Sequence, residues 1–276
     1  MDEQRMVDTE LGSLAVRTIG EGVPAVLWHS LFVDDRSWNG LLDDLAKVRR
    51  LVVITGPGHG ASADPGRRYS MDECAQAART ILDALGIDGA VDWVGNAWGG
   101  HVGVVFAARW PDRCRSLVMI GAPLHALGRY GYTRISLLNK AYHLLGMRQF
   151  LVHAVIGTLL SPRTRDTDPA AVQLVSDCLT GANPGGLRNA ITSISLHRPS
   201  SLDLLPGVPA PTLIITGPDH KDWTPAQAEA ACRMLPYGSV AIIPDTAYLA
   251  PLEAPVETAR LVSQFWARHP VISATT

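Results

Sequence analysis

The segment Gly95–Gly100 has the composition and setting of a turn that presents a catalytic nucleophile, but it carries none. An apolar run over residues 90–94 precedes it, and a helical pattern over residues 101–110 follows it. A glycine-flanked turn between a strand and a helix is the setting of the nucleophile elbow, G-x-S-x-G, which raises a serine above the edge of a sheet. Here the serine position holds Ala97, whose methyl group cannot attack a substrate.

The composition is that of a globular protein, and the length fits one large domain or two small ones. Its 276 residues are 47% hydrophobic, and the formal net charge is -2. This charge predicts no general affinity for nucleic acid or an anionic membrane. The four cysteines have no close pair, which favours reduced thiols and a cytoplasmic location. The polar N-terminus lacks a signal core, and no apolar run reaches transmembrane length.

Strand and helix patterns alternate over most of the chain. We expect an early antiparallel strand at 14–19, and then buried strands at 24–29, 51–54, 90–94, 116–120, 212–216 and 239–243. Helical patterns cover 37–48, 70–85, 101–110, 224–234 and 253–268. This alternation predicts an α/β protein with a mostly parallel sheet that is covered on both faces.

The alternation stops between residues 124 and 199, where only helical periodicity is found. We interpret this region as a helical cap, or lid, inserted into a core made of residues 1–123 and 200–276. The insertion holds more Lys and Arg than Asp and Glu. An anionic ligand would explain this excess, but a solvated basic helix face explains it more simply.

Four separate motifs give the chain a family resemblance. They are the segment from His29 to Trp38, which starts H-S-L, and the segments 58–62, 95–100 and 247–255. In order and spacing they resemble those of α/β-hydrolase-fold proteins with a helical cap, whose sheet has eight mostly parallel strands. The first motif is particularly similar to that of the 3-oxoadipate enol-lactonases. The chain departs from the family at Thr55, where aspartate is usual, at Ala97, and at Tyr248, which replaces the catalytic histidine.

The resemblance also implies where the rest of a site would lie. The family acid falls within residues 217–225, where Asp222 and Asp219 are both near the usual spacing and Asp222 is slightly favoured. Each aspartate could equally be a loop carboxylate or a helix cap. The oxyanion donors would be the backbone N–H groups of Leu31 and Trp98. Further expected pocket residues are His29, Phe32 and His125.

Ordinary serine-type hydrolysis is not expected from these residues. A tyrosine with a pKa near 10 stays protonated at neutral pH, so Tyr248 cannot act as the base. Loss of a triad residue costs on the order of 10⁴ to 10⁶ in rate. An oxyanion hole without a nucleophile could still stabilise an enolate, with Tyr248 as proton donor and His29, His101 or His125 as base. The simpler alternatives are that His29 supports the oxyanion loop, His101 is packed, His125 is solvated, and Tyr248 fills volume.

Three hypotheses follow, none of which involves a cofactor or a metal ion. No G-x-G-x-x-G loop follows the first strand, and no His and carboxylate cluster has metal-ligand spacing. The first hypothesis is a pocket for a small hydrophobic carbonyl compound with non-hydrolytic lyase, isomerase or cyclase chemistry. The second is an ester or lactone hydrolase, in which Ala97 replaces serine by design or another group activates water. The third is a non-enzymatic ligand receptor or interaction partner built on the same fold. The expected partner is a small-molecule ligand or substrate, and the oligomeric state is left open.

Overall fold

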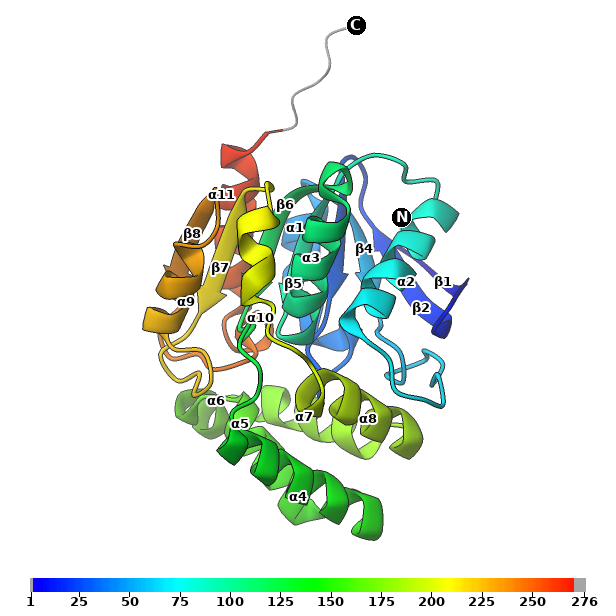
Figure 1. Cartoon of the computed structure of the whole chain (residues 1–276), viewed down its shortest axis with the longest axis vertical. Helices are drawn as coiled ribbons and strands as arrows, with labels where there is room; N and C mark the ends of the chain where they lie inside the picture. Colours follow the sequence, from blue (N-terminus) through cyan, green and yellow to red (C-terminus); the bar gives the residue numbers. More distant parts are fainter. Residues whose placement is uncertain (1, 271–276) are drawn as a thin grey trace, which may run out of the picture.

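A computed structural model describes residues 2–270 and contains one eight-stranded sheet (Figure 1). The strand order is β1-β2-β4-β3-β5-β6-β7-β8. The first two strands run antiparallel to their neighbours, and the remaining strand pairs are parallel. This order confirms the predicted α/β-hydrolase fold. The strands are β1 Asp2–Thr9, β2 Gly12–Ile19, β3 Pro24–Trp28, β4 Arg50–Ile54, β5 Val91–Asn96, β6 Cys114–Ile120, β7 Thr212–Thr216 and β8 Gly238–Ile242.

Helices cover both faces of the sheet because its central strands are apolar on both sides. In β3, Val26 faces the cluster that contains α2 and α3, whereas Leu27 faces the cluster that contains α1 and α11. A capping box formed by Ser70 and Glu73 begins α2, as its sequence predicts. The covering helices and their short neighbours are η1 Asp35–Trp38, α1 Asn39–Ala46, α2 Met71–Ala84, α3 Trp98–Arg109, η2 Pro111–Arg113, η4 Leu202–Gly207, α9 Pro225–Cys232, α10 Ala250–Glu253 and α11 Pro255–Arg268.

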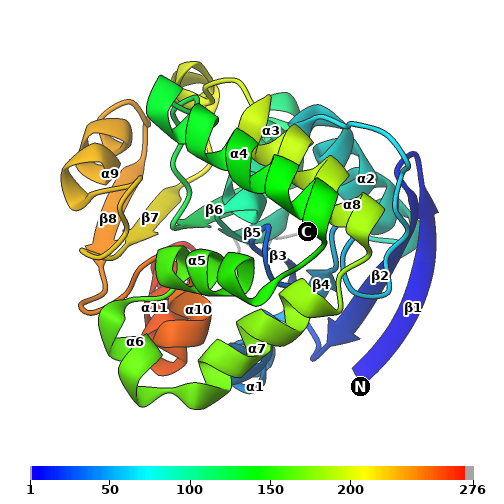
Figure 2. The same cartoon turned by 90° about the horizontal axis from the view of Figure 1, so that it is seen from below.

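Residues 124–199, called the helical segment below, form a group of helices at one end of the sheet. Figures 1 and 2 show α4, α5, α7 and α8 lying across the end at which the elbow turn connects β5 to α3. Over residues 2–270, no helix combines the length and the apolar character that crossing a membrane requires. The segment contains α4 Arg129–Leu145, α5 Gln149–Leu159, α6 Pro162–Thr167, α7 Pro169–Thr180, α8 Pro184–Ala190 and a π-helix, η3, at Ile191–Leu196.

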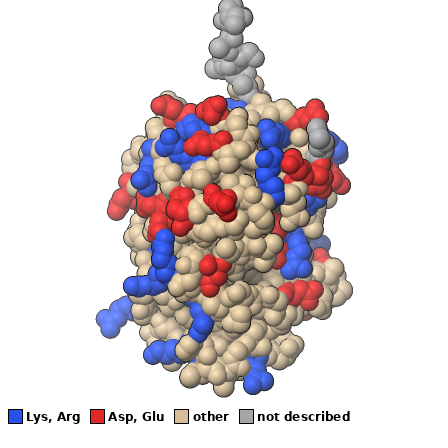
Figure 3. Space-filling view, turned by 90° about the vertical axis from the view of Figure 1, so that its right-hand side faces the viewer, with Lys and Arg blue, Asp and Glu red and all other residues tan. Residues whose placement is uncertain are grey.

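Charged side chains are unevenly distributed over the surface. Figure 3 shows acidic and basic groups mixed over the α/β part, whereas the helical segment is mostly uncharged with scattered Lys and Arg. Several large apolar side chains of α4 and α5 are exposed there, such as Tyr130, Leu144 and Phe150. On the face shown in Figure 3, the basic groups of the segment are therefore spread out and do not form one dense patch.

The structure corrects the sequence prediction at the N-terminus and at two helices. Strand β1 was not predicted, because it lies at the sheet edge and pairs with β2 through backbone bonds that its polar side chains do not reveal. The helix expected at 37–48 is a 3₁₀ turn followed by α1, since Asp34 caps the chain at Arg36. The closing helix begins at Pro255, because proline favours the first helical position.

Candidate functional site

The elbow turn keeps a strained backbone although it lacks a serine. Ala97 has φ 45° and ψ -100°, a conformation that L-residues rarely adopt. A Cβ added at Gly95 would lie 2.1 Å from Gly99, and a Cβ added at Gly99 would lie 1.9 Å from the carbonyl oxygen of Trp28. Both glycines are therefore needed for the close approach of β3, β5 and α3. The N–H of Ala97 donates to the carbonyl of Ile120, which fixes the turn above β6.

The backbone around Tyr248 is fixed from three sides. Its N–H donates to the carbonyl of Leu159 at the end of α5, and its carbonyl accepts a hydrogen bond of 2.8 Å from the side-chain amide of Asn96. The carboxylate of Glu253 accepts from the N–H groups on either side of Tyr248. Because Asn96 directly precedes Ala97, these contacts tie the position of Tyr248 to the elbow.

The side chain of Tyr248 lies between Asp222 and His220. Its hydroxyl donates a hydrogen bond to Asp222, and its ring stacks on His220 with centroids 3.6 Å apart. Burial, together with the charge of Asp222, raises the pKa of Tyr248. Asp219 instead bonds through its backbone to Thr246 and does not line the cavity. Of the two candidate acids, the structure therefore brings Asp222 to the position next to Tyr248.

His220 is a site residue that sequence reasoning missed. Its Nε2–H donates to the carbonyl of Gly121 at 3.2 Å, and burial lowers the pKa of His220 to about 4. The ring is therefore neutral at neutral pH and forms a flat support for Tyr248. The only available signal was its place beside Asp219 and Asp222 in the segment that the resemblance marked for the acid.

His29 belongs to the support of the loop that follows β3 and does not line the cavity. It is fully buried, its Nδ1–H donates to the carbonyl of Ser30 at 2.7 Å, and its Nε2 accepts from the N–H of Gly56 at 2.8 Å. Burial lowers the pKa of His29 to about 3. The expectation that His29 could act as a base is wrong, because both ring nitrogens are engaged. His59 supports the same loop, with its ring against the carbonyl of Leu31.

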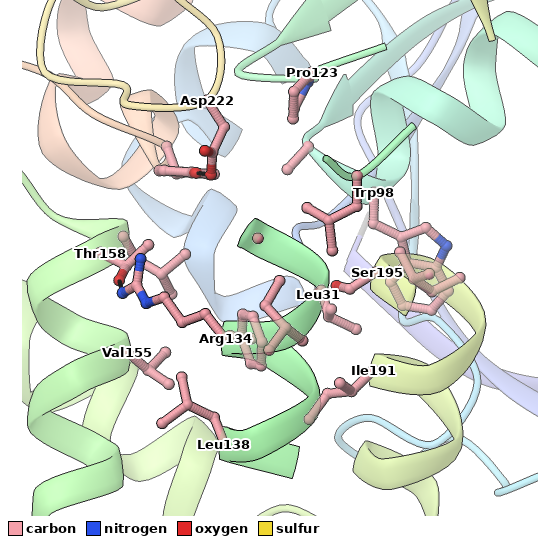
Figure 4. Close-up of a pocket in the computed structure, with 18 of the residues that line it drawn as sticks. Leu31, Trp98, Pro123, Arg134, Leu138, Val155, Thr158, Ile191, Ser195 and Asp222 are labelled. Atoms are coloured by element: carbon pink, nitrogen blue, oxygen red, sulfur yellow. Dashed lines mark hydrogen bonds between the residues drawn. The ribbon is translucent and has the colours of Figure 1, made fainter. Parts of the chain in front are cut away.

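A cavity of about 530 Å³ lies between the elbow and the helical segment. Ala97, Tyr248 and Asp222 all line it, and the remaining wall is mainly apolar. The expected pocket residues Leu31, Phe32, Trp98 and His125 also line it, as does His101. In Figure 4, Asp222 lies across the cavity from Ser195 and Ile191, with Val155 and Leu138 from the helical segment at its lower side.

Trp98 has a second role in the core of the protein. It is 1% exposed, and its ring packs edge-on against Trp28 at 5.3 Å and near His29 and His59. Trp98 therefore closes the base of the cavity while most of its ring is buried.

The cavity wall carries more positive than negative charge. Arg134, Arg198 and Lys221 line it together with the carboxylate of Asp222. The Nη2 group of Arg134 also donates a hydrogen bond to the hydroxyl of Thr158 in α5, and the two side chains lie together at the cavity wall in Figure 4. Within residues 2–270, no group of three or more His, Cys, Asp and Glu side chains is arranged to hold a metal ion.

The fold and the elbow turn define an α/β-hydrolase-fold protein, and comparisons with known proteins agree. Residues 24–138 match the family model described as alpha/beta hydrolase fold. An esterase from Thermogutta terrifontis superposes with a TM-score of 0.89 at 23% identity, covering 97% of this chain and 100% of the esterase. The enol-lactonase from Burkholderia xenovorans LB400 superposes with a TM-score of 0.87 at 21% identity, covering 95% and 99%. The chain therefore has the α/β-hydrolase fold, and the match to the family model covers residues 24–138.

Sequence relatives include hydrolases and a synthase. The 2-hydroxy-6-oxo-2,4-heptadienoate hydrolase of Pseudomonas putida is 32% identical over 121 residues, which is 44% of this chain and 41% of that protein. The chain thus matches about two fifths of the length of this relative. A putative 2-succinyl-6-hydroxy-2,4-cyclohexadiene-1-carboxylate synthase of Bacillus subtilis is 26% identical over 247 residues, which is 87% of this chain and 89% of that protein.

Proposed function

We propose that the cavity binds a small, largely apolar carbonyl compound and that the protein promotes enolate chemistry on it without serine-type hydrolysis. The observation that carries this proposal is the hydrogen-bonded pair of Tyr248 and Asp222 beside Ala97. A carboxylate and a phenol border the space in which a substrate carbonyl would lie. The position of the nucleophile holds only a methyl group.

In this proposal, the loop after β3 and the start of α3 supply the donors of an oxyanion hole. Leu31 and Trp98 both line the cavity, and among residues 2–270 neither backbone N–H has a hydrogen-bond acceptor. The N–H of Trp98 is at the first turn of α3, where the helix dipole favours negative charge. Two free donors at this point could hold an enolate oxygen as they would hold a tetrahedral oxyanion.

The proposed step needs only groups that line the cavity. Asp222 takes a proton from the carbon next to the ligand carbonyl, the C–H electron pair forms a carbon–carbon double bond, and the carbonyl π pair moves to oxygen. The N–H groups of Leu31 and Trp98 hold the resulting negative charge. The proton then returns from the Asp222 carboxyl group, or through the hydroxyl of Tyr248, to the same or another carbon. The net result is exchange or isomerisation.

Hydrolysis of an ester, a lactone or a carbon–carbon bond next to a ketone is the second candidate. The names of several relatives favour it, among them the heptadienoate hydrolase and a 2-hydroxymuconate semialdehyde hydrolase that is 35% identical over 107 residues. The name of the Bacillus relative, a synthase, does not specify hydrolysis. With Ala97 in place, a hydrolytic route requires that another group activates a water molecule. Asp222, whose carboxylate lines the cavity, would be that group.

A panel of short acyl esters and small lactones separates the two candidates. The chain would be assayed beside Ala97→Ser, Tyr248→His and the double variant, with heat-denatured protein as the control. We expect the unaltered chain to stay at background and the double variant to gain hydrolysis, because the oxyanion donors remain in place. Turnover by the unaltered chain above the denatured control would instead establish the hydrolase candidate.

A cytoplasmic location remains part of the proposal. It is supported by the four cysteines, all of which are free. A reducing compartment is where such thiols persist.

A further inference from the structure

Arg198 is placed where the helical segment ends, between two cavities. It lines the cavity that contains Ala97 and also a second cavity of about 510 Å³. Its Nη2 donates to the carbonyls of Pro123 at 3.0 Å and His125 at 2.9 Å. Its Nη1 makes a longer contact of 3.4 Å with the carbonyl of Pro199. These bonds fix the guanidinium at the point where the chain enters and leaves the helical segment.

The positive charge of Arg198 has no carboxylate partner among residues 2–270. Its contacts are to backbone carbonyls, and its Nε–H has no acceptor there. Burial lowers the pKa of Arg198 to about 10, so the group is still protonated at neutral pH. By contrast, the two partly buried arginines Arg49 and Arg115 both pair with the carboxylate of Asp92. A partly buried cation without a counter-ion is unfavourable, and an anionic ligand would remove this cost.

His101 adds a second unpartnered polar group at the same place. It is 3% exposed and lines the cavity one helical turn after Ala97, and neither ring nitrogen has a hydrogen-bond partner among the described residues. Nδ1 is fully enclosed, whereas Nε2 is not, so Nε2 is the nitrogen that a ligand could reach. Burial, with the nearby charge of Arg198, holds the pKa of His101 well below its usual range. The imidazole is therefore neutral, and its N–H group can donate a hydrogen bond to a ligand oxygen.

We propose that Arg198 and His101 form a carboxylate-binding subsite, so that the cavity selects ligands that carry a carboxylate in addition to a carbonyl group. The guanidinium supplies an N–H donor and a positive charge, and a carboxylate is a preferred partner of both. The subsite deepens the proposed function and depends on it, because it specifies what else the carbonyl ligand carries. The carbonyl oxygen would meet the donors of Leu31 and Trp98.

Arg198 also ties the two ends of the helical segment together, and this structural role must be separated from ligand binding. A variant could lower all affinities by loosening the segment. The informative quantity is therefore the ratio of affinities for an acid and for its uncharged amide. Loosening changes both affinities, whereas loss of a charge partner changes the ratio.

Four probes measure the subsite and the proposed function separately by titration calorimetry. They are 4-oxo-4-phenylbutanoate and its amide, and 4-phenylbutanoate and its amide, which lack the ketone. We expect the unaltered chain to prefer each acid over its amide by about tenfold or more. Arg198→Gln is expected to reduce this preference to about twofold or less. Lys221→Gln is the matched control, because it removes the same charge from the same cavity and should keep most of the preference.

Three results would overturn the subsite. The first is equal affinity of the unaltered chain for acids and amides, and the second is an unchanged preference for the acids in Arg198→Gln. The third is an equal loss of that preference in Lys221→Gln, which would mean that the overall positive charge of the cavity, and not Arg198, attracts the acids. If Arg198→Gln does not fold, the unaltered chain would instead be treated with phenylglyoxal, which modifies arginine side chains. The extent of modification of Arg198 would be measured by peptide mass mapping with and without each probe. The acids, but not the amides, should protect Arg198 from modification, and equal protection by acids and amides would contradict the subsite. Equal affinities of the keto and the ketone-free acids would count against the carbonyl-binding function alone. Failure of all four probes to bind at millimolar concentration would reject both.

Discussion

Replacing Tyr248 by phenylalanine is expected to lower the free energy of unfolding by about 1 to 2 kcal/mol, because it removes one hydrogen bond and little else. The ring would remain buried and stacked on His220. A hydrogen bond to a charged acceptor contributes about 1.5 to 3 kcal/mol, and we reduce this value because Asp222 is exposed and water can replace the phenol as its donor. Tyr237→Phe removes the same hydroxyl from a tyrosine that is 67% exposed and should change stability very little.

A double-mutant cycle tests the contact itself. Urea denaturation at pH 7 would be measured for the unaltered chain, Tyr248→Phe, Asp222→Ala and the double variant. Alanine is preferred to asparagine, because an amide oxygen could still accept the hydrogen bond. We expect a coupling energy of about 1 kcal/mol or more, whereas unrelated sites add within about 0.3 to 0.5 kcal/mol. Additivity within that margin would refute the pairing of Tyr248 with Asp222.

Three further predictions concern the support of the site. Asp92→Ala should cost about 3 to 5 kcal/mol in urea denaturation, because it leaves the partly buried cations Arg49 and Arg115 unpaired. Ala97→Gly should raise the unfolding free energy by about 1 kcal/mol, since it relieves the φ of 45°. The pKa of His220 is about 4 in the folded protein and 6.5 without burial, so its share of the stability falls by about 3 kcal/mol as the pH drops from 6.5 to 4. His220→Gln should flatten this dependence.

Each of these predictions can fail in a definite way. A loss below about 1 kcal/mol for Asp92→Ala would mean that water already screens the pair. Destabilisation by Ala97→Gly would mean that the turn is not strained. The stability is expected to fall with falling pH because, between pH 6.5 and 4, the unfolded chain binds a proton at His220 that the folded chain does not. An unchanged pH dependence in His220→Gln would place the titration elsewhere, for example at the buried His29.

Local signals were enough to predict most of the fold. Apolar runs such as residues 51–54 and the capping box at Ser70 belong to single elements, so a short window of sequence contains the cause of the structure. Strand β1 was missed because an edge strand is stabilised by hydrogen bonds to β2, and its side chains need not be apolar. The elbow was visible because Gly95 and Gly99 meet a steric requirement within the same turn.

The site was less predictable because its contacts join distant parts of the chain. The choice between Asp219 and Asp222 depended on which side chain reaches a residue some 26 positions further on, Tyr248. The importance of His220 and Arg198 depends on burial and on the lack of a charge partner, neither of which a sequence contains. For the same reason His29, whose residue type suggested a base, proved to be an enclosed support of the loop.

Proton exchange in heavy water tests the central claim most directly. 4-Oxo-4-phenylbutanoate would be incubated with the protein in D₂O, and the signal of the CH₂ next to the ketone would be followed by proton NMR. We expect faster loss of this signal with the unaltered chain than with heat-denatured protein, loss of the effect in Asp222→Asn, and no hydrolysis product. Exchange at the background rate, or cleavage products in the same spectra, would contradict enolate formation at this site.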